Sequence, residues 1–492
     1  DREMTMADRS AKSDAPVVPR EFLFPFVLTT SLFALWGFAN DITNPMVAAF
    51  KNILLISNFE SSLVQFAFYG GYCVMAIPAA IFIKRFTYQS GLILGLALYA
   101  TGCLLFIPSG WMMAFWAFLL AYFIMTCGLS FLETSANPYI LSLGPEETAT
   151  RRLNFAQAFN PIGSLTGMLV AKNFILQKLD PMPEEARRAL LASDPSKFKA
   201  IADHDLDVII LPYVLLGLVV LVTMVIFIIA KLPRNKNEGH VSLDLGPTFR
   251  RLVSNRRYTA SVVAQTFYVG TQIMCWTFII QYAEQTLGMT KADGQFYNMI
   301  AMLIFVTSRF ICTFLLKFFN PGALLFVLAT GGLLLIVWTI FGGGNPEAGA
   351  ALTAQLQQAT GDATGPASAA AALGVYLKAP FLISGMSGLM ALVGVSACMS
   401  LMFPTIYGIA LEGLGDDAKL GAAGLIMAIG GGCLMPPIQG WIMDQDAFNL
   451  GFMSLASVRA SFVLPLICFA VIMVYGWKMY RRRVSPLPTC NV

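Results

Sequence analysis

Residues 131–147 read FLETSANPYILSLGPEE, and residues 403–417 read FPTIYGIALEGLGDD. Each segment carries a proline inside an apolar run, followed by a turn that contains leucine, glycine and acidic residues. Each also lies in the fourth apolar run of its half of the chain. The repetition indicates two related halves, which predicts two helical bundles with a site between them.

The composition is that of an integral membrane protein. Of the 492 residues, 57% are hydrophobic and 12% are charged, whereas soluble proteins carry roughly 25% charged residues. So few charged side chains cannot cover the surface of a water-soluble globule of this length. The net charge of +4 is too small and too dispersed to indicate a nucleic-acid partner.

Twelve apolar runs are long enough to cross about 30 Å of hydrocarbon as helices. They are continuously apolar rather than alternating, which excludes a membrane β-barrel. The predicted fold is therefore all-α, with twelve transmembrane helices in two pseudo-symmetric six-helix bundles. The predicted spans are 22–52, 61–83, 91–107, 112–141, 153–176, 208–231, 258–284, 296–318, 322–342, 384–411, 419–443 and 458–480.

The longest connection on the side of the N-terminus separates the spans into six and six. One further long connection, 343–383, is rich in glycine, alanine, glutamine and threonine. It is predicted either to form a helix on or near the membrane or to be disordered, but not to span. The predicted parts are a polar N-terminal segment (1–21), a first bundle (22–231), a linker (232–257), a second bundle (258–480) and a tail (481–492).

Basic residues in the short connections set the expected orientation, because cytoplasmic loops carry an excess of lysine and arginine. They gather on the side of the N-terminus and are sparser in the short loops of the opposite side. Both termini are therefore predicted to face the cytoplasm. The basic groups are Lys84–Arg85, Arg151–Arg152, the cluster from Lys231 to Arg257, Lys317 and Arg481–Arg483.

Three ionisable residues stand out inside the predicted spans, where each costs at least about 2.5–3.5 kcal/mol on insertion and needs a reason. They are Asp41, Glu133 and Arg309. An arginine cannot lose its proton and must find carboxylates, carbonyls or water. Arg309 is predicted to make a structural or gating ion pair rather than to contact a ligand.

Asp41 belongs to a polar group that interrupts an apolar helix. Its companions are Asn40, Thr43 and Asn44, and Pro45 closes the group. A proline frees a backbone carbonyl one turn earlier, so oxygen ligands gather near Asp41. The segment is predicted to be a cation or sugar site near the midplane, with a helix end reaching headgroup water as the alternative.

Glu133 is the candidate for proton exchange. Glu133 and Asn137 are four residues apart and share one face of a helix. A carboxyl group in an apolar, desolvating setting is typical of proton-coupled sites. The alternative is a glutamate that a neighbour such as Arg309 neutralises permanently.

A stripe of polar and aromatic residues follows the seventh predicted helix. Gln265, Tyr268 and Gln272 recur at spacings of three and four residues, with Trp276 one turn further on. Amides both donate and accept, and an indole offers a flat apolar face, so the set suits a neutral polyhydroxylated ligand. Each glutamine alone has the alternative of a hydrogen bond between helices. Two more amides lie in the fifth predicted helix: Gln157 and Asn160.

At these residues the sequence resembles the fucose–proton symporter family of the major facilitator superfamily. The resemblance covers nearly the whole chain apart from the insertion. No single segment is specific, but together they are. The matching segments are SLFALWG (31–37), QFAFYGGY (65–72), LETSANP (132–138), RLNFAQAFN (152–160), the stretch 264–276 and PTI (404–406).

The resemblance implies an alternating-access carrier that moves a hexose or deoxyhexose together with a cation. Glu133 falls on the family's coupling glutamate, and two helix-five amides fall on residues that bind sugar or hold that glutamate. Trp276 is the favoured stacking residue, Trp36 is the reserve, and Phe403 falls where the family can offer a polar aromatic. The predicted substrate-binding residues are Asn40, Asn137, Gln157, Asn160, Gln265, Tyr268, Gln272, Trp276, Trp36 and Phe403.

The first helix departs from the family pattern. Aligned without gaps, the family's coupling aspartate falls on Asn44, and Asp41 lies about one turn earlier. Asp41 is predicted to take over the role from the same helix face. The resemblance favours the proton as the coupling ion, and sodium held by Asp41, Thr43 and Asn44 is the alternative.

The sequence thus predicts a secondary active importer of an L-fucose-like or glucose/galactose-type sugar, coupled most simply to protons. A sodium-coupled symporter and a multidrug exporter of the same fold are the alternatives. An enzyme is disfavoured, because the chain contains no HExxH, GxSxG or GxxxxGK[ST] motif. The expected partners are a small sugar and the lipid bilayer, with no cofactor, nucleic acid or obligatory protein partner, in a bacterial inner membrane.

Overall fold

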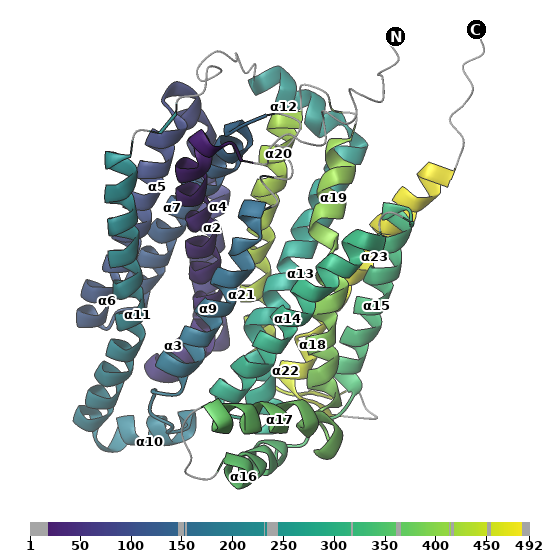
Figure 1. The fold of residues 1–492 in the computed structure, drawn as a ribbon. Coiled ribbons are helices and arrows are strands. Elements are labelled where there is room, and N and C mark those ends of the chain that lie inside the picture. The colour runs from purple at the N-terminus through teal and green to yellow at the C-terminus, as the bar shows by residue number, and fades with distance from the viewer. Residues whose placement is uncertain are drawn as a thin grey trace, which may run out of the picture. The chain divides into compact units, whose positions relative to one another are not determined.

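The protein is described here from a computed structural model (Figure 1), which covers residues 18–145, 152, 155–230, 232–233, 245–315, 318–360, 366–412, 414, 418–449 and 454–484. Helices account for nearly all of this structure. A short 3₁₀-helix, Arg20–Phe22, precedes α2. The helices up to residue 229 are α2 (Leu23–Thr43), α3 (Met46–Leu54), α4 (Asn58–Arg85), α5 (Tyr88–Leu104), α6 (Phe106–Met112), α7 (Phe115–Ser142), α9 (Phe159–Val170), a π-helix (Ala171–Leu176), α10 (Glu184–Ser193) and α11 (Pro195–Ile229).

The remaining elements repeat the all-helical pattern, with one small hairpin of two-residue strands between α21 and α22. They are α12 (Leu245–Ser254), α13 (Arg256–Leu287), α14 (Lys291–Leu315), α15 (Pro321–Phe341), α16 (Ala348–Thr360), α17 (Pro366–Leu382), α18 (Ser387–Met399), α19 (Met402–Leu411), α20 (Ala418–Met427), a 3₁₀-turn (Ala428–Gly430), α21 (Gly431–Met443), β1 (Phe448–Asn449), β2 (Ser454–Leu455), α22 (Ser457–Ala460) and α23 (Val463–Val484). The predicted all-α class is confirmed.

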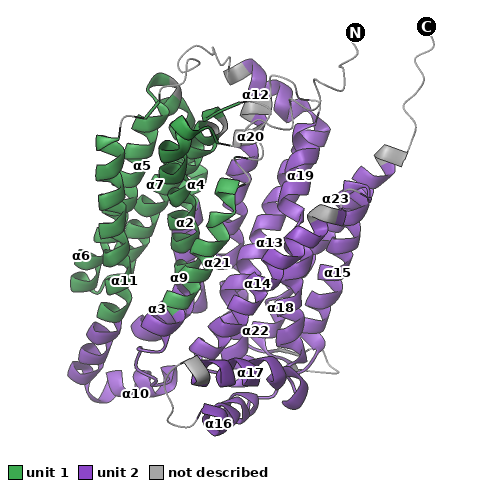
Figure 2. Ribbon diagram, viewed as in Figure 1, with its two compact units in different colours: residues 1–43, 70–171, 206–243 green, residues 44–69, 172–205, 244–492 purple. Residues whose placement is uncertain are grey.

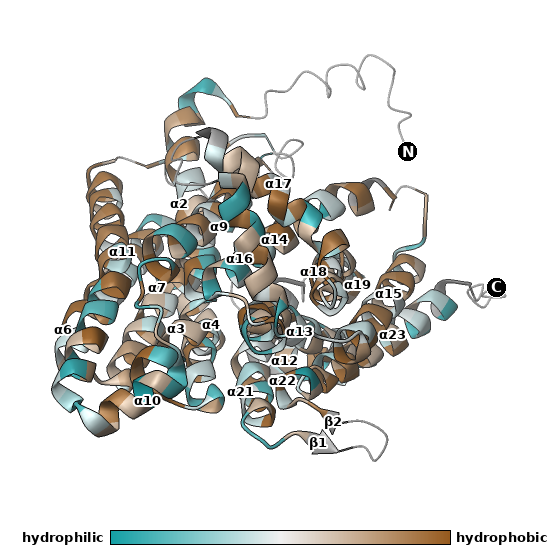
Figure 3. Cartoon of the chain, turned by 90° about the horizontal axis from the view of Figure 1, so that it is seen from below, coloured by the Kyte–Doolittle hydropathy of each residue, from teal (hydrophilic) through white to brown (hydrophobic). Residues whose placement is uncertain are grey.

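Among the described residues, eleven helical segments are long and apolar enough to cross a membrane. They correspond to eleven of the twelve predicted spans. The predicted span 153–176 differs, because there α9 has twelve residues and passes into the π-helix Ala171–Leu176. Figure 3 shows the contrast in hydropathy between such segments and the loops: α15 is predominantly hydrophobic, whereas α10 carries hydrophilic residues.

The described part of the insertion 343–383 is mainly helical. It contains α16 and α17, and the apolar part of α17, Ser368–Leu382, is shorter than a membrane span. This agrees with the helical alternative of the prediction.

The chain divides into two compact units, which Figure 2 colours separately. One unit contains residues 1–43, 70–171 and 206–243, and the other contains residues 44–69, 172–205 and 244–492. Within the first unit α5 packs against α7 and α2 against α9. Within the second, α15 packs against α23, α14 against α18 and α13 against α21.

Close helix packing through glycine recurs at equivalent places in the two halves. In the first half, a Cβ on Gly163 of α9 would lie 1.9 Å from the carbonyl oxygen of Ala34 on α2. In the second half, a Cβ on Gly431 at the start of α21 would lie 2.0 Å from the carbonyl oxygen of Thr266 on α13. Small residues let membrane helices approach closely. The first and fifth helices of each half therefore pack alike, as the sequence repetition leads one to expect.

Candidate functional site

The polar group in the first helix coincides with a break in that helix. α2 ends at Thr43 and α3 begins at Met46, so Asn44 and Pro45 form the turn between them. The side chains of Asp41 and Asn44 are each about 1% exposed. A proline removes one helical hydrogen bond and clashes with the preceding turn, which explains why the helix is interrupted here.

Thr43 joins the break to a pair of tyrosines in the same compact unit. Its hydroxyl donates to the carbonyl oxygen of Ala39 at 2.8 Å and lies 3.4 Å from the hydroxyl of Tyr213. The Tyr213 hydroxyl in turn lies 2.9 Å from that of Tyr122. The hydroxyl of Thr43 is thus held inside a buried network, although the sequence had offered it as an ion ligand.

Asn44 belongs to a second network that the sequence did not predict. Gln65 on α4 donates from Nε2 to Oδ1 of Asn44 at 3.1 Å and to the hydroxyl of Thr277 on α13 at 3.0 Å. Gln65 and Thr277 are completely buried. The isolated glutamine in an apolar run was the available signal, because a buried amide needs partners.

Glu133 stands next to two of the amides predicted to accompany it. Asn137 donates to the backbone carbonyl oxygen of Glu133 at 3.1 Å, and Gln157 donates to Oδ1 of Asn137 at 3.2 Å. Oε2 of Glu133 is buried and has no hydrogen-bond partner among the described residues. A buried carboxyl oxygen without a donor is costly unless it is protonated or meets a ligand. This arrangement suits a group that takes up and releases a proton.

The remaining predicted residues of the first half are Asn160, Trp36 and Asn40. Asn160 donates to the carbonyl oxygen of Phe33 at 3.3 Å and so joins α9 to α2. The ring centres of Trp36 and Tyr72 lie 6.4 Å apart, with an angle of 29° between the ring planes. Trp36 is half-buried, which leaves part of its ring accessible. Asn40, one turn further along α2, is also half-buried.

The stripe on α13 divides into two residues that donate hydrogen bonds to α18 and two glutamines. The Tyr268 hydroxyl donates to the carbonyl oxygen of Met399 at 3.1 Å, and Nε1 of Trp276 donates to the hydroxyl of Ser396 at 3.1 Å. Gln265 is completely buried, and neither atom of its amide has a hydrogen-bond partner among the described residues. Gln272 is half-buried. Gln265 therefore has amide atoms left for a ligand, and the amide of Gln272 is partly accessible.

Arg309 and Phe403 lie in aromatic surroundings in the second unit. The guanidinium of Arg309 lies 4.8 Å from the ring centre of Phe305 and donates from Nε to the carbonyl oxygen of Ser400 at 3.2 Å. The rings of Phe305 and Trp276 pack edge to face, with their centres 5.0 Å apart. Phe403 lies 6.2 Å from the ring of Tyr268. Phe305 thus joins Arg309 to Trp276, a link absent from the sequence prediction.

Lys172 is an ionisable residue of a predicted span that the sequence analysis missed. It lies in the π-helix, with Nζ 4.5 Å from the ring centre of Phe296 and 5.2 Å from that of Tyr376. These two rings stack at 4.0 Å, and the Tyr376 hydroxyl donates to the carboxylate of Asp293. Lys172 and Asp293 therefore hold Tyr376, and with it α17 of the insertion.

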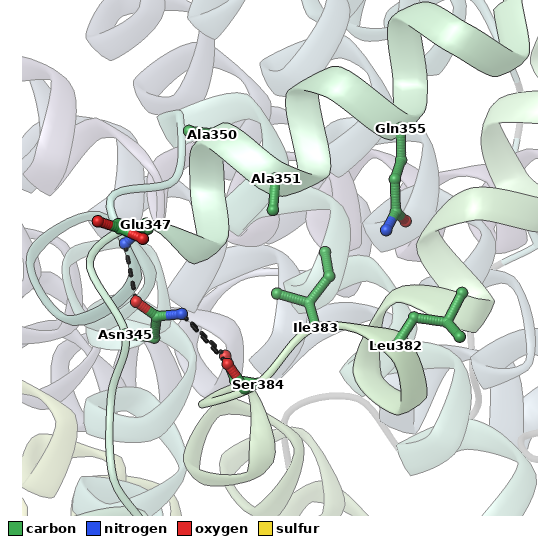
Figure 4. Close-up of a pocket in the computed structure, with 8 residues that line it drawn as sticks. All are labelled: Asn345, Glu347, Ala350, Ala351, Gln355, Leu382, Ile383 and Ser384. Atoms are coloured by element: carbon green, nitrogen blue, oxygen red, sulfur yellow. Dashed lines mark hydrogen bonds between the residues drawn. The ribbon is translucent and has the colours of Figure 1, made fainter.

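The insertion forms a pocket of about 610 Å³, and Figure 4 shows the residues that line it. Asn345 forms hydrogen bonds with the backbone of Glu347 and with Ser384 at its rim. None of the predicted site residues lines this pocket. It is a hollow formed by the insertion and is separate from the candidate site.

Comparison with known proteins gives the family. The family model "Major Facilitator Superfamily" matches residues 29–356. The chain belongs to the major facilitator superfamily. This facilitator is 47% identical to the L-fucose-proton symporter of Haemophilus influenzae over 95% of its own length and 99% of the relative's. It is 27% identical to a glucose/galactose transporter of Brucella abortus over 92% of its own length and 94% of the relative's.

A solved structure agrees with the fold. The facilitator is similar to the crystal structure of FucP, a major facilitator superfamily transporter in the outward conformation, with a TM-score of 0.64 and 30% sequence identity. The match covers 94% of this chain and 99% of FucP. The resemblance inferred from the sequence motifs is confirmed, and the chain is a membrane transporter by family rather than an enzyme.

Proposed function

We propose that this facilitator imports a hexose or deoxyhexose by proton symport, through alternating access. The observation that carries the proposal is the arrangement of Glu133, whose buried Oε2 lacks a described donor beside the Asn137–Gln157 amide pair. Burying that oxygen without a hydrogen-bond donor costs free energy, and protonation removes this cost. A proton on Glu133 and a sugar bound nearby therefore stabilise the same conformation of the carrier.

The ligand class follows from the unpaired and half-buried polar groups. Gln265 has both amide atoms available, and the half-buried Trp36 offers an apolar face. Relatives named L-fucose-proton symporter and glucose/galactose transporter support a sugar of one of these two types. The protein acts in the inner membrane, with both termini in the cytoplasm, as the basic residues of the connections indicate.

Sodium coupling is the second candidate, because Asp41 and Asn44 bring oxygen atoms to the break between α2 and α3. Carboxylate, amide and carbonyl oxygens are the ligands that hard cations prefer.

The test is uptake of a panel of labelled hexoses and deoxyhexoses into proteoliposomes, with proton and sodium gradients imposed separately. The proposal expects accumulation of one sugar type driven by an inward proton gradient without sodium. Accumulation that needs sodium at fixed pH would move the coupling to the Asp41 group. Gradient-independent flux of the whole panel, or export of apolar drugs instead, would refute sugar symport.

A further inference from the structure

A hollow between α13 and α23 lies outside the candidate transport site. It has a volume of about 710 Å³. It is lined by α13 and α23, which pack against each other (Figure 1), and by Val253 of α12. Small side chains leave the space: Ala260 and Ala264 on α13, and Ala470 on α23. The Ser261 hydroxyl lies 2.7 Å from that of Tyr475, which joins the helices beside the hollow.

The hollow is apolar along its length and basic at one end. Arg256 opens α13 and Lys478 lies near the end of α23, and both line the hollow with exposed side chains. None of the residues that line it is acidic. The neighbouring Arg257 forms an ion pair with Glu412, whereas no ion pair among the described residues includes Arg256 or Lys478.

Flanking residues place the basic end at the depth of lipid headgroups. Trp477 and Tyr480 on α23 are exposed, as expected for aromatic residues at a membrane interface. α12, which precedes α13, exposes Phe249 and Val253 beside basic Arg250. A helix that combines exposed apolar and basic residues in this way is typical of one lying in the interface.

The length of the hollow fits one leaflet. At about 1.5 Å per helical residue, Arg256 to Ala264 spans roughly 12 Å, and Lys478 to Ile467 spans roughly 16 Å. Half of a ~30 Å hydrocarbon core is about 15 Å. A molecule with an anionic head at Arg256 and Lys478 and an acyl chain against Val263 and Ile467 therefore matches both ends of the hollow.

We propose that the α13–α23 hollow is a binding site for an anionic phospholipid, whose phosphate pairs with Arg256 and Lys478 and whose acyl chain lies between the helices. Basic pockets between transmembrane helices recognise such headgroups, because the cations gain from pairing near the bilayer surface. The site is separate from sugar transport and does not depend on the proposed function.

The experiment measures lipid binding to the full-length protein by native mass spectrometry after adding phosphatidylglycerol or phosphatidylcholine of the same chain length. The unmodified protein is expected to prefer phosphatidylglycerol. The double variant Arg256→Gln/Lys478→Gln should lower that preference by about fivefold or more, because it removes both basic side chains that attract the anionic headgroup. The control Lys197→Gln/Lys199→Gln removes the same charge from the exposed start of α11 and should leave the preference unchanged.

A second variant tests the apolar part without changing charge. Ala260→Phe fills the hollow and should reduce phosphatidylglycerol binding, whereas Val222→Phe on the exposed face of α11 should not. Undiminished preference in the double variant overturns the proposal. Undiminished phosphatidylglycerol binding by Ala260→Phe would also overturn the proposal. The same holds if inorganic phosphate at equal concentration displaces the lipid, because either result shows that the acyl chain contributes nothing.

Discussion

At the scale of single residues, Glu133 is the group on which ion coupling depends. Replacing it with the isosteric, permanently neutral glutamine keeps the packing and mimics the protonated state. Glu133→Gln is therefore expected to retain sugar exchange between two equal pools and to lose accumulation driven by a proton gradient. The measurement compares counterflow with gradient-driven uptake in proteoliposomes.

The matched control is Glu60→Gln, which neutralises an exposed glutamate that accepts hydrogen bonds from Ser57. It should leave both activities intact. Uphill uptake by Glu133→Gln at the unmodified rate would contradict the assigned role.

Trp276 is predicted to stack on the sugar, and its contacts with other residues decide which variants can test this. The indole is 5% exposed, donates to Ser396 and meets Phe305, so its removal also affects packing. Trp276→Ala is expected to weaken sugar binding by about 1–3 kcal/mol, as when a large interface contact is truncated. Binding is measured by calorimetry on protein that passes size exclusion.

Trp276→Phe separates stacking from the hydrogen bond, because it keeps an apolar ring and removes the N–H that bonds to Ser396. It should retain most of the affinity. The control Trp116→Ala alters an exposed tryptophan at the start of α7 and should have no effect. Equal affinities for the Trp276→Ala and Trp116→Ala proteins would place the sugar elsewhere.

At the scale of helices, the first turn of α4 is capped by a residue far away in the sequence. Asp444, which follows α21, accepts hydrogen bonds at 2.7–2.8 Å from the backbone N–H groups of Asn58 and Phe59 and from the Asn58 side chain. A carboxylate satisfies these otherwise unpaired donors and interacts favourably with the helix dipole.

Asp444→Ala is therefore expected to destabilise the protein by about 0.5–2 kcal/mol, the usual effect of losing a helix cap. Asp444→Asn should have a smaller effect, because an amide oxygen still accepts a hydrogen bond. Thermal unfolding in detergent measures both. The control is Asp446→Asn, two residues further on and exposed; if it lowers the melting temperature as much as Asp444→Ala does, the cap is not the cause.

α10 carries a carboxylate whose charge matters for stability. Partial burial alone would raise the pKa of Glu184, but hydrogen bonds and charges from Arg188 and Lys51 outweigh it, so the pKa lies below its ordinary value of 4.5. Its oxygens lie 2.8 Å from Arg188 and 3.4 Å from Lys51. The pair with Arg188 lies within α10, and the pair with Lys51 attaches α10 to α3.

A lowered folded-state pKa means that the stabilisation is complete above pH 4.5 and disappears as the pH falls through the folded value. Glu184→Gln is expected to lower the free energy of unfolding at pH 7 by about 0.2–1 kcal/mol, as for a partly exposed ion pair. This difference from the unmodified protein should shrink as the pH falls below 4.5 and through the folded-state pKa. Thermal melts across this range provide the check, with the exposed Glu185→Gln as control. A constant difference at every pH would exclude the carboxylate charge as its origin.

At the scale of the whole molecule, the choice of coupling ion depends on Asp41. If protons drive transport, uptake should follow the pH gradient without sodium, and Asp41→Asn should abolish that response. If sodium drives it, sugar affinity should rise with sodium at fixed pH, and the same change should remove that dependence. Asp203→Asn, at an exposed position near the start of α11, is the control. If Asp41→Asn retains its response to the pH gradient and to sodium, coupling depends on Glu133 alone.

The sequence by itself determined the membrane class, the helical fold, the duplication and the break at Pro45. These properties depend on hydropathy and backbone stereochemistry, which act over one helix or less. It also brought Glu133, Asn137 and Gln157 into one group, because two of them share a helix face and the third lies in a family motif.

Only the tertiary structure decided which polar groups pair. Gln65 meets Asn44 and Thr277, Trp276 donates to Ser396, and Asp444 caps α4 from 386 residues away. The sequence identifies each of these side chains as polar but not the partner that satisfies it. The reason is physical: the partner depends on which faces of the helices meet, and long-range packing fixes those faces after the local pattern has formed the helices.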